Sequence, residues 1–167
     1  MNSKSVIHFT EEQKFTQWWM WLFIAIPFII GVFGCYKQLI LAENFGNKPM
    51  SNLGLVFTTL FGVAFMLFFY INKLTTKITD KGVHVQFFPY TKRFHSWEEI
   101  SQVEVIKYGF VGGWGVRLWT QYGTVYNVKG GRGLYVQLKG KENFLIGTQN
   151  PEALHKVVLQ LSQVTTQ

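Results

Sequence analysis

The sequence predicts a membrane α-hairpin followed by a mainly-β domain that ends in an α-helix. Three observations predict this architecture: two long uncharged apolar runs, a later series of short alternating segments punctuated by glycines, and a change to helical periodicity near the end. The 167 residues carry a formal net charge of +7, and residues 73–167 hold 12 Lys or Arg against six Asp or Glu. The apolar and charged parts of the chain are therefore separate.

The two apolar runs predict transmembrane helices. Residues 18–36 and 53–71 are each 19 residues long and contain no charged side chain. A helix of this length reaches about 28 Å, close to the ~30 Å hydrocarbon thickness of a bilayer. We predict helices over about 18–42 and 53–72, and therefore a hairpin over 18–72.

The lysines near the helix ends predict the orientation of the hairpin. Residues 1–17 precede it as an N-terminal cytoplasmic segment, and residues 73–167 follow it as a cytoplasmic domain. Lysines are more frequent at the outer ends of the pair than near its connecting loop, which is the bias of cytoplasmic segments. Both termini of this multi-pass protein are therefore expected in the cytoplasm. The lysines compared are Lys4, Lys14, Lys73, Lys77 and Lys81 against Lys37 and Lys48.

Cys35, the only cysteine, raises an alternative for the first helix. The Gly-Cys pair at 34–35 is what a lipoprotein processing site requires. Glu11 and Glu12 in the preceding segment and the bulky Phe33 are atypical of such a signal. We favour an uncleaved helix, and lipidation of Cys35 is kept as the alternative.

The second half of the chain predicts antiparallel strands. Residues 74–79 and 83–87 alternate apolar and polar side chains around Asp80, Lys81 and Gly82, which is typical of a hairpin. Further short segments follow at regular spacing and predict a sandwich or barrel. These segments are 92–96, 101–107, 115–120, 124–128, 134–138 and 144–146.

A C-terminal helix is predicted over 151–163. Asn150 is a favourable N-cap, Pro151 suits the first helical position, and Glu152 favours the positive end of the helix dipole. Leu154, Val158 and neighbouring apolar residues recur on one helical face. We expect this face to pack on the β-structure.

Several short motifs resemble bacterial pleckstrin-homology-like domains attached to small membrane hairpins. The resemblance implies a seven-stranded, strongly bent antiparallel sheet or barrel capped by the C-terminal helix. It also implies binding and scaffolding more than catalysis. The motifs that carry it are 97–100 leading into 103–105, 113–117, 126–128 and 147–152.

Basic residues near the predicted membrane surface are candidates for non-specific contact with anionic lipids. Each Lys or Arg near such a surface contributes about 1 kcal/mol. Eukaryotic relatives of the wider fold hold phosphoinositides with a basic first loop, but this loop is only Asp80, Lys81 and Gly82. No specific phosphoinositide binding is therefore expected. The candidate lipid contacts are Lys73, Lys77, Lys81, Lys92 and Arg93.

Aromatic residues in two turns are candidates for membrane or partner contact. Phe110 and Trp114 lie in a glycine-rich stretch, and Phe87 and Phe88 precede Pro89. Adjacent residues of a strand point to opposite faces, so one of Phe87 and Phe88 is expected to face outward. The alternative for Phe110 and Trp114 is an ordinary hairpin loop whose aromatics fold back onto the sheet.

Other functional classes find little support in the sequence. His8, His84, His95 and His155 lack metal-site spacing, no GxSxG turn presents a nucleophile, and no cofactor motif occurs. The scattered basic charge fits no nucleic-acid module. We predict a non-enzymatic membrane protein that binds a protein partner or itself, with an accessory subunit of a larger complex and an uncharacterised membrane-bound enzyme as alternatives.

Overall fold

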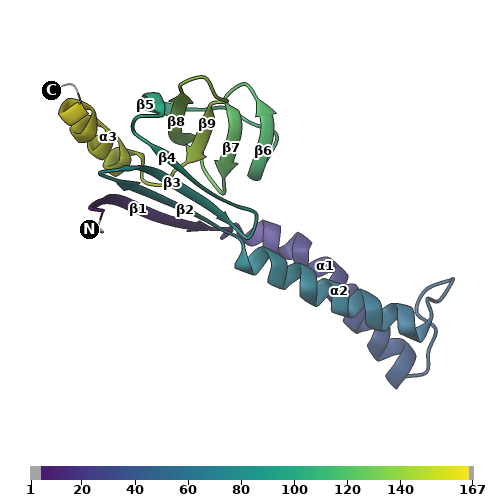
Figure 1. Cartoon of the computed structure of the whole chain (residues 1–167). Helices are drawn as coiled ribbons and strands as arrows, with labels where there is room; N and C mark the ends of the chain where they lie inside the picture. Colours follow the sequence, from purple (N-terminus) through teal and green to yellow (C-terminus); the bar gives the residue numbers. More distant parts are fainter. Residues whose placement is uncertain (1–4, 166–167) are drawn as a thin grey trace. The chain divides into compact units, whose positions relative to one another are not determined.

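The chain forms two compact units. The computed structural model describes residues 5–165, and side chains through Leu161. Thr16–Ile71 form a helical unit, whereas Met1–Phe15 and Asn72–Gln167 belong to a second, β-rich unit (Figure 1). The helical unit therefore coincides with the apolar part of the sequence, and the β-rich unit holds most of the charged residues.

The helical unit contains two long apolar helices. α1 (Trp18–Cys35) continues into a short π-helical segment (Tyr36–Ile40), and α2 (Asn52–Ile71) follows after a loop. Both helices are long and apolar enough to cross a membrane, judged by length and composition. The predicted pair of apolar helices is confirmed, and the first ends at Ile40 rather than near residue 42.

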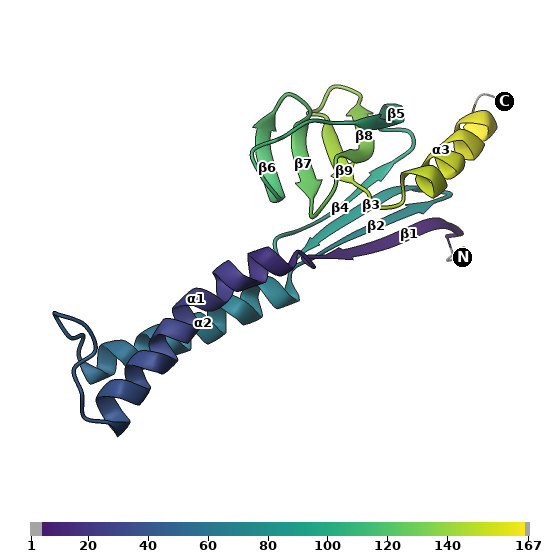
Figure 2. The same cartoon turned by 180° about the vertical axis from the view of Figure 1, so that it is seen from behind.

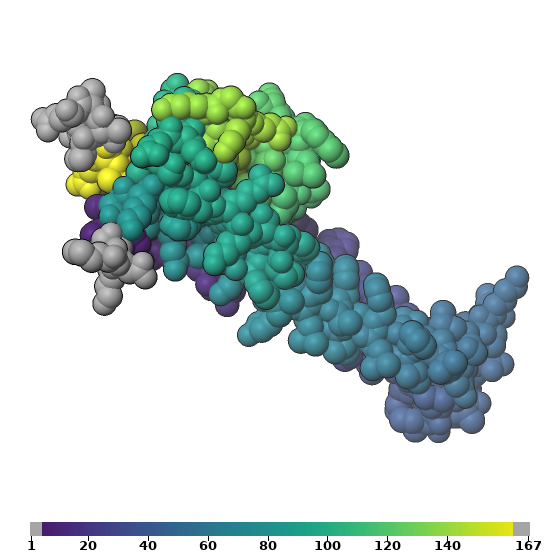
Figure 3. All heavy atoms as spheres, viewed as in Figure 1, coloured from purple at the N-terminus to yellow at the C-terminus, as the bar shows by residue number. Residues whose placement is uncertain are grey.

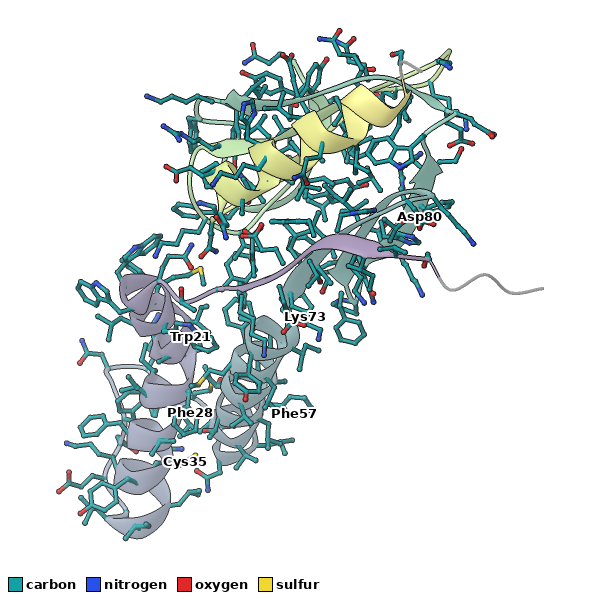
Figure 4. The ribbon with its side chains drawn as sticks, turned by 90° about the vertical axis from the view of Figure 1, so that its left-hand side faces the viewer. Trp21, Phe28, Cys35, Phe57, Lys73 and Asp80 are labelled. Atoms are coloured by element: carbon teal, nitrogen blue, oxygen red, sulfur yellow. The ribbon has the colours of Figure 1, made fainter. Side chains whose placement is uncertain are left out.

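Glycines allow α1 and α2 to approach closely. A Cβ added at Gly62 of α2 would lie 2.5 Å from the backbone N of Phe28, and one at Gly31 of α1 would lie 2.8 Å from the Cα of Thr59. The larger apolar side chains are instead mostly exposed within the chain, as Phe57 on α2 illustrates (Figure 4). Small residues thus form the helix contact and large ones cover the outside.

The first sheet of the β-rich unit has four antiparallel strands. They are β1 (Ile7–Lys14), β2 (Lys73–Thr79), β3 (Gly82–Phe88) and β4 (Thr91–Ser96), in the order β1-β2-β3-β4. Gly82 begins β3 after the turn that pairs β2 with β3, and a Cβ there would collide with the carbonyl O of His95 on β4. The predicted 74–79 and 83–87 hairpin is therefore present.

The second sheet has five strands. They are β5 (Ile100–Lys107), β6 (Gly115–Thr120), β7 (Gly123–Asn127), β8 (Arg132–Leu138) and β9 (Phe144–Gly147), in the order β5-β8-β9-β7-β6. β7 and β9 run parallel, and the other neighbours are antiparallel. β6 lies at one edge of the sheet.

The expectation of a single seven-stranded sheet or barrel is wrong. The described residues form nine strands in two separate sheets. The chain turns sharply between β4 and β5, where Glu99 N donates to Ser96 O and Ile100 N donates to Trp97 O. These turns redirect the chain, so β5 pairs with β8 and does not continue the ladder of β4. Trp97 is half-buried and its Nε1 donates to Thr79 O at 3.0 Å.

The core lies between the two sheets, which form separate layers in Figures 1 and 2. Val83 and Val85 of β3 and Leu134 and Val136 of β8 are fully buried. The rings of His95 and Phe144 lie 4.8 Å apart and join the layers.

α3 (Pro151–Thr165) contacts β1, β5 and β8 and so touches an edge strand of each sheet. Its Leu154 and Val158 are buried, as the predicted apolar face requires. Ala153 N donates to Asn150 Oδ1 at 3.4 Å, which makes Asn150 the expected N-cap.

β1 is a strand that the sequence analysis did not predict. Residues 1–17 were treated as a segment preceding the hairpin, yet Ile7–Lys14 pairs with β2 in a register that sets Lys14 opposite Lys73. The inward positions of β1 include Gln13, which is buried and donates from Nε2 to Gly147 O at 2.7 Å. A polar inward residue hides the alternation on which strand prediction depends.

Candidate functional site

The outer face of the first sheet gathers three of the five predicted lipid-contact residues. Lys73 and Lys77 alternate on β2 with the buried Leu74 and Ile78, so both lysines point away from the core. In the register, Lys77 lies opposite His84 and Lys92 lies opposite Gln86, which places Lys92 on the same face.

The other two predicted lipid contacts lie elsewhere. Arg93 is opposite Val85 and therefore belongs to the other face of the sheet. Burial raises the pKa of Tyr126 there, and the charge of Arg93 only partly opposes this shift. Lys81 lies in the turn between β2 and β3. The five residues are therefore not one basic surface.

Glu12 compensates the charge of some lysines on the basic face and not of others. Its carboxylate lies 2.8 Å from Lys73 Nζ and 3.7 Å from Lys14 Nζ. The hydrogen bond from Lys73, aided by the charges of Lys73 and Lys14, lowers the pKa of Glu12. Within residues 5–165, no carboxylate pairs with Lys77 or Lys92. The uncompensated positive charge therefore lies around these two lysines.

His84 lies between Lys77 and Lys92. A hollow of about 290 Å³ opens here, and its lining includes Lys77, His84 and Lys92 together with Thr75 and Gln86. The His84 ring packs against Phe94 with centroids 4.3 Å apart. Partial burial, followed by the charges of Lys77 and Lys92, lowers the pKa of His84. His84 was not among the predicted site residues, because a lone histidine in an alternating strand carries no motif.

A second group of exposed apolar residues lies in the loop before β6 and on β6 itself, and we call it the 110–119 surface; it comprises Phe110, Trp114, Leu118 and Trp119. Phe110 is 90% exposed and Trp114 is 38% exposed. The Phe110 side chain therefore points into solvent, whereas most of the Trp114 side chain is covered by its own chain. Figure 3 shows the green atoms of this part of the chain at the rim of the β-rich unit.

Trp119 extends this surface along β6 and was missed by the sequence analysis. Its side chain is 88% exposed and its backbone φ is +54°, a left-handed conformation that large residues rarely adopt. The β6–β7 register shifts between Arg117 and Thr120, so the strand bulges at Trp119. The adjacent pair Leu118-Trp119 was a usable signal, because both residues cannot be buried in one regular strand.

Phe87 and Phe88 have opposite environments. Phe87 is 1% exposed and its ring lies 6.4 Å from that of Phe15, so its prediction as a membrane or partner contact is wrong. Phe88 is partly exposed, and the strand alternation explains the difference. Phe88 pairs with Lys73, the first residue of β2, at the end of the sheet that directly follows α2 in the chain.

The polar cluster around Glu99 connects two turns of the β-rich unit. No group of three or more His, Cys, Asp or Glu that could hold a metal ion occurs in the described part of the chain. Glu99 contacts His95 at 3.4 Å and Lys141 at 3.2 Å. The hydrogen bond from Lys141 is the main cause of the lowered pKa of Glu99. This arrangement ties the turn before β5 to the turn before β9.

The chain was compared with protein-family models, curated proteins and solved structures, and none of them matches it. The geometry alone therefore defines the two candidate sites, which are the basic face around His84 and the 110–119 surface.

Proposed function

We propose that this chain is a non-enzymatic integral membrane protein whose cytoplasmic β-rich unit is a protein-interaction or scaffolding module. The observation that carries the proposal is Trp119, a large aromatic side chain 88% exposed on an edge strand. Tryptophan is enriched among the residues that dominate protein interfaces. A partner that buries Trp119 would account for its exposure in the isolated chain.

The two apolar helices support the membrane part of the proposal. Contiguous exposed apolar surface is rare on soluble monomers, whereas α1 and α2 expose many large apolar side chains. Two crossings return the chain to its starting side, which fits the pairing of Lys14 with Lys73 in one sheet. The exposed apolar residues include Leu22, Phe23, Ile29, Phe57, Leu60 and Phe61.

The lysine bias supports an orientation with both termini in the cytoplasm. The bacterial inner membrane is the location that the resemblance to bacterial pleckstrin-homology-like domains implies. A reporter fused after Gln167 tests the orientation. We expect activity from a reporter that works only inside the cell and none from one that works only outside it. The reverse result would place the β-rich unit on the outer side.

A protein segment suits the 110–119 surface better than lipid does. Among the residues that the structure describes, one edge of β6 has no neighbouring strand, so its backbone N–H and C=O groups lack sheet partners there. Unpaired backbone groups are costly in hydrocarbon but can bind an added strand. We therefore propose a partner strand along β6, with apolar side chains packed on Leu118 and Trp119.

The two-sheet arrangement is compatible with a variant of the pleckstrin-homology-like fold. A terminal helix that contacts both sheets is the feature in favour. The parallel β7–β9 pair departs from an entirely antiparallel arrangement.

Purification of the full chain in mild detergent after in-cell cross-linking tests the interaction. We expect a stoichiometric protein partner that is lost in Trp119→Ala and retained in Leu159→Ala, which removes an exposed apolar side chain on α3. A large membrane assembly would identify the chain as an accessory subunit. Recovery of the chain without any cross-linked protein, in both variants and the unmodified chain, would contradict the proposal.

A further inference from the structure

The hollow on the outer face of the first sheet presents positive charge from two directions. Lys77 on β2 and Lys92 on β4 flank the intervening strand β3, from which His84 and Gln86 point outward. Neighbouring strands lie about 4.8 Å apart, so two long lysine side chains on alternate strands can reach a ligand above the strand between them. The lining residues described contain no carboxylate.

We infer that this hollow binds a phosphate-bearing anion, held between Lys77 and Lys92 above the ring of His84. A phosphate group offers several oxygens in a tetrahedral arrangement and accepts strong charge-assisted hydrogen bonds. Two ammonium groups, an imidazole N–H and the amide of Gln86 supply donors from different sides. The volume of about 290 Å³ leaves room for a small organic group attached to the phosphate.

The contact of His84 with Phe94 holds the imidazole ring in place beside the hollow. The rings are tilted by 34° with centroids 4.3 Å apart. Burial and the two lysine charges lower the pKa of His84, and a bound anion would act in the opposite direction. Binding should therefore raise the pKa of His84, and affinity should increase as the pH falls through it.

The carboxylates on the adjoining elements bind other partners, so they do not offset the effect of Lys77 and Lys92 on the pKa of His84. Glu12 of β1 lies opposite Thr75, but its carboxylate is held by Lys73 and Lys14. Asp80, in the turn after β2, accepts a hydrogen bond from Val6 N at 3.0 Å. The groups that face His84 from neighbouring strands are thus Lys77 and Lys92.

This inference goes beyond the proposed function, because it concerns a defined ligand site on the other sheet from β6. It also replaces diffuse lipid attraction with a specific arrangement of donors. The phosphate can belong to a soluble molecule or to a lipid headgroup. The two sources share one chemistry and are separated by the experiment.

Histidine ring NMR on the full chain provides the test. The chain is reconstituted in phosphatidylcholine nanodiscs, and the His84 resonance is assigned by its loss in His84→Gln. Inorganic phosphate is titrated against sodium chloride of matched ionic strength. A second preparation replaces part of the phosphatidylcholine with phosphatidylglycerol. We expect one or both probes to raise the pKa of His84, and the probe that does so identifies a soluble or a lipid source.

The matched variants are Lys77→Gln, Lys92→Gln and, as a control, Lys129→Gln, which changes an exposed lysine between β7 and β8. Removal of a charge-assisted hydrogen bond should weaken binding by about tenfold or more for each of the first two variants. The control should bind as the unmodified chain does. A His84 resonance that responds to neither probe, or that responds equally in the Lys77→Gln and Lys92→Gln double variant, would overturn the inference.

Discussion

The carboxylate of Glu11 accepts a 2.6 Å hydrogen bond from the hydroxyl of Thr148, which joins the beginning of the chain to the segment that leads into α3. The other carboxylate oxygen accepts from Gln149 N at 2.8 Å. Thr148 is buried, and its Oγ1 also accepts from Asn150 N at 3.1 Å. β1 is thereby fixed to the start of the C-terminal helix as well as to β2.

Replacement of Glu11 by Ala should therefore destabilise the β-rich unit. The substitution leaves the buried Thr148 hydroxyl and the Gln149 N–H without their acceptor, which costs about 1–3 kcal/mol. Urea unfolding of the full chain in detergent, followed by circular dichroism, measures the effect. Glu104→Ala removes an exposed carboxylate of β5 and should change the free energy of unfolding by less than about 0.5 kcal/mol. Equal effects of the two substitutions would show that the Glu11 contacts contribute nothing.

The buried tyrosines predict a loss of stability at alkaline pH. Burial raises the pKa of both Tyr108 and Tyr126 above the usual value of 10.0. Between the unfolded and the folded pKa, the unfolded chain loses these protons while the folded chain keeps them, so stability falls as the pH rises. Urea unfolding at about pH 9 and about pH 11 should show a larger decrease for the unmodified chain than for Tyr108→Phe with Tyr126→Phe. A decrease of equal size in both proteins would contradict this assignment.

The α1–α2 contact can be tested with the only cysteine. Cys35 Sγ lies 3.6 Å from Thr59 Oγ1 across the helix pair. In Thr59→Cys, the two sulfurs should form a disulfide on treatment with copper phenanthroline, with the loss of two hydrogen atoms in the intact mass. Thr58→Cys is the control, because the Thr58 hydroxyl contacts Gly54 O and Met50 Sδ, neither of which belongs to α1.

Failure of both cysteine variants to cross-link would contradict the hairpin contact. The same mass spectrum tests the lipoprotein alternative. An acylated chain that begins at Cys35 would lack residues 1–34, so its mass would be lower overall despite the added acyl chains, and its modified sulfur could not form the bond. We expect neither feature in the intact protein.

The sequence was sufficient to predict the elements that have regular periodicity. The apolar runs gave α1 and α2, the alternation gave the β2–β3 hairpin, and Asn150 with Pro151 gave the start of α3. Each of these signals is local, since it depends on side chains within one element. β1 was not predicted because the inward-pointing residue Gln13 is polar. Its side chain donates a hydrogen bond to Gly147 O, 134 residues away in the chain.

The sheet arrangement depends on contacts that no local pattern contains. β5 pairs with β8, and β7 pairs in parallel with β9, across intervening strands. The same limit applies to the candidate sites. Alternation predicted that one of Phe87 and Phe88 is buried but not which one, and the gathering of Lys77, His84 and Lys92 needed the register of three strands.

A substitution of Trp119 separates the cost of its left-handed backbone conformation from the role of its exposed side chain. A left-handed conformation costs a residue other than glycine about 1 kcal/mol or more, and glycine adopts it without this cost. Trp119→Gly should therefore keep the free energy of unfolding within about 1 kcal/mol of the unmodified chain, or raise it, although a large residue has been removed. The same variant should lose the cross-linked partner, since the exposed indole is gone. Urea unfolding and cross-linking of one preparation measure both effects. A marked loss of stability would show that Trp119 packs against its own chain and would remove the main support for a partner at β6.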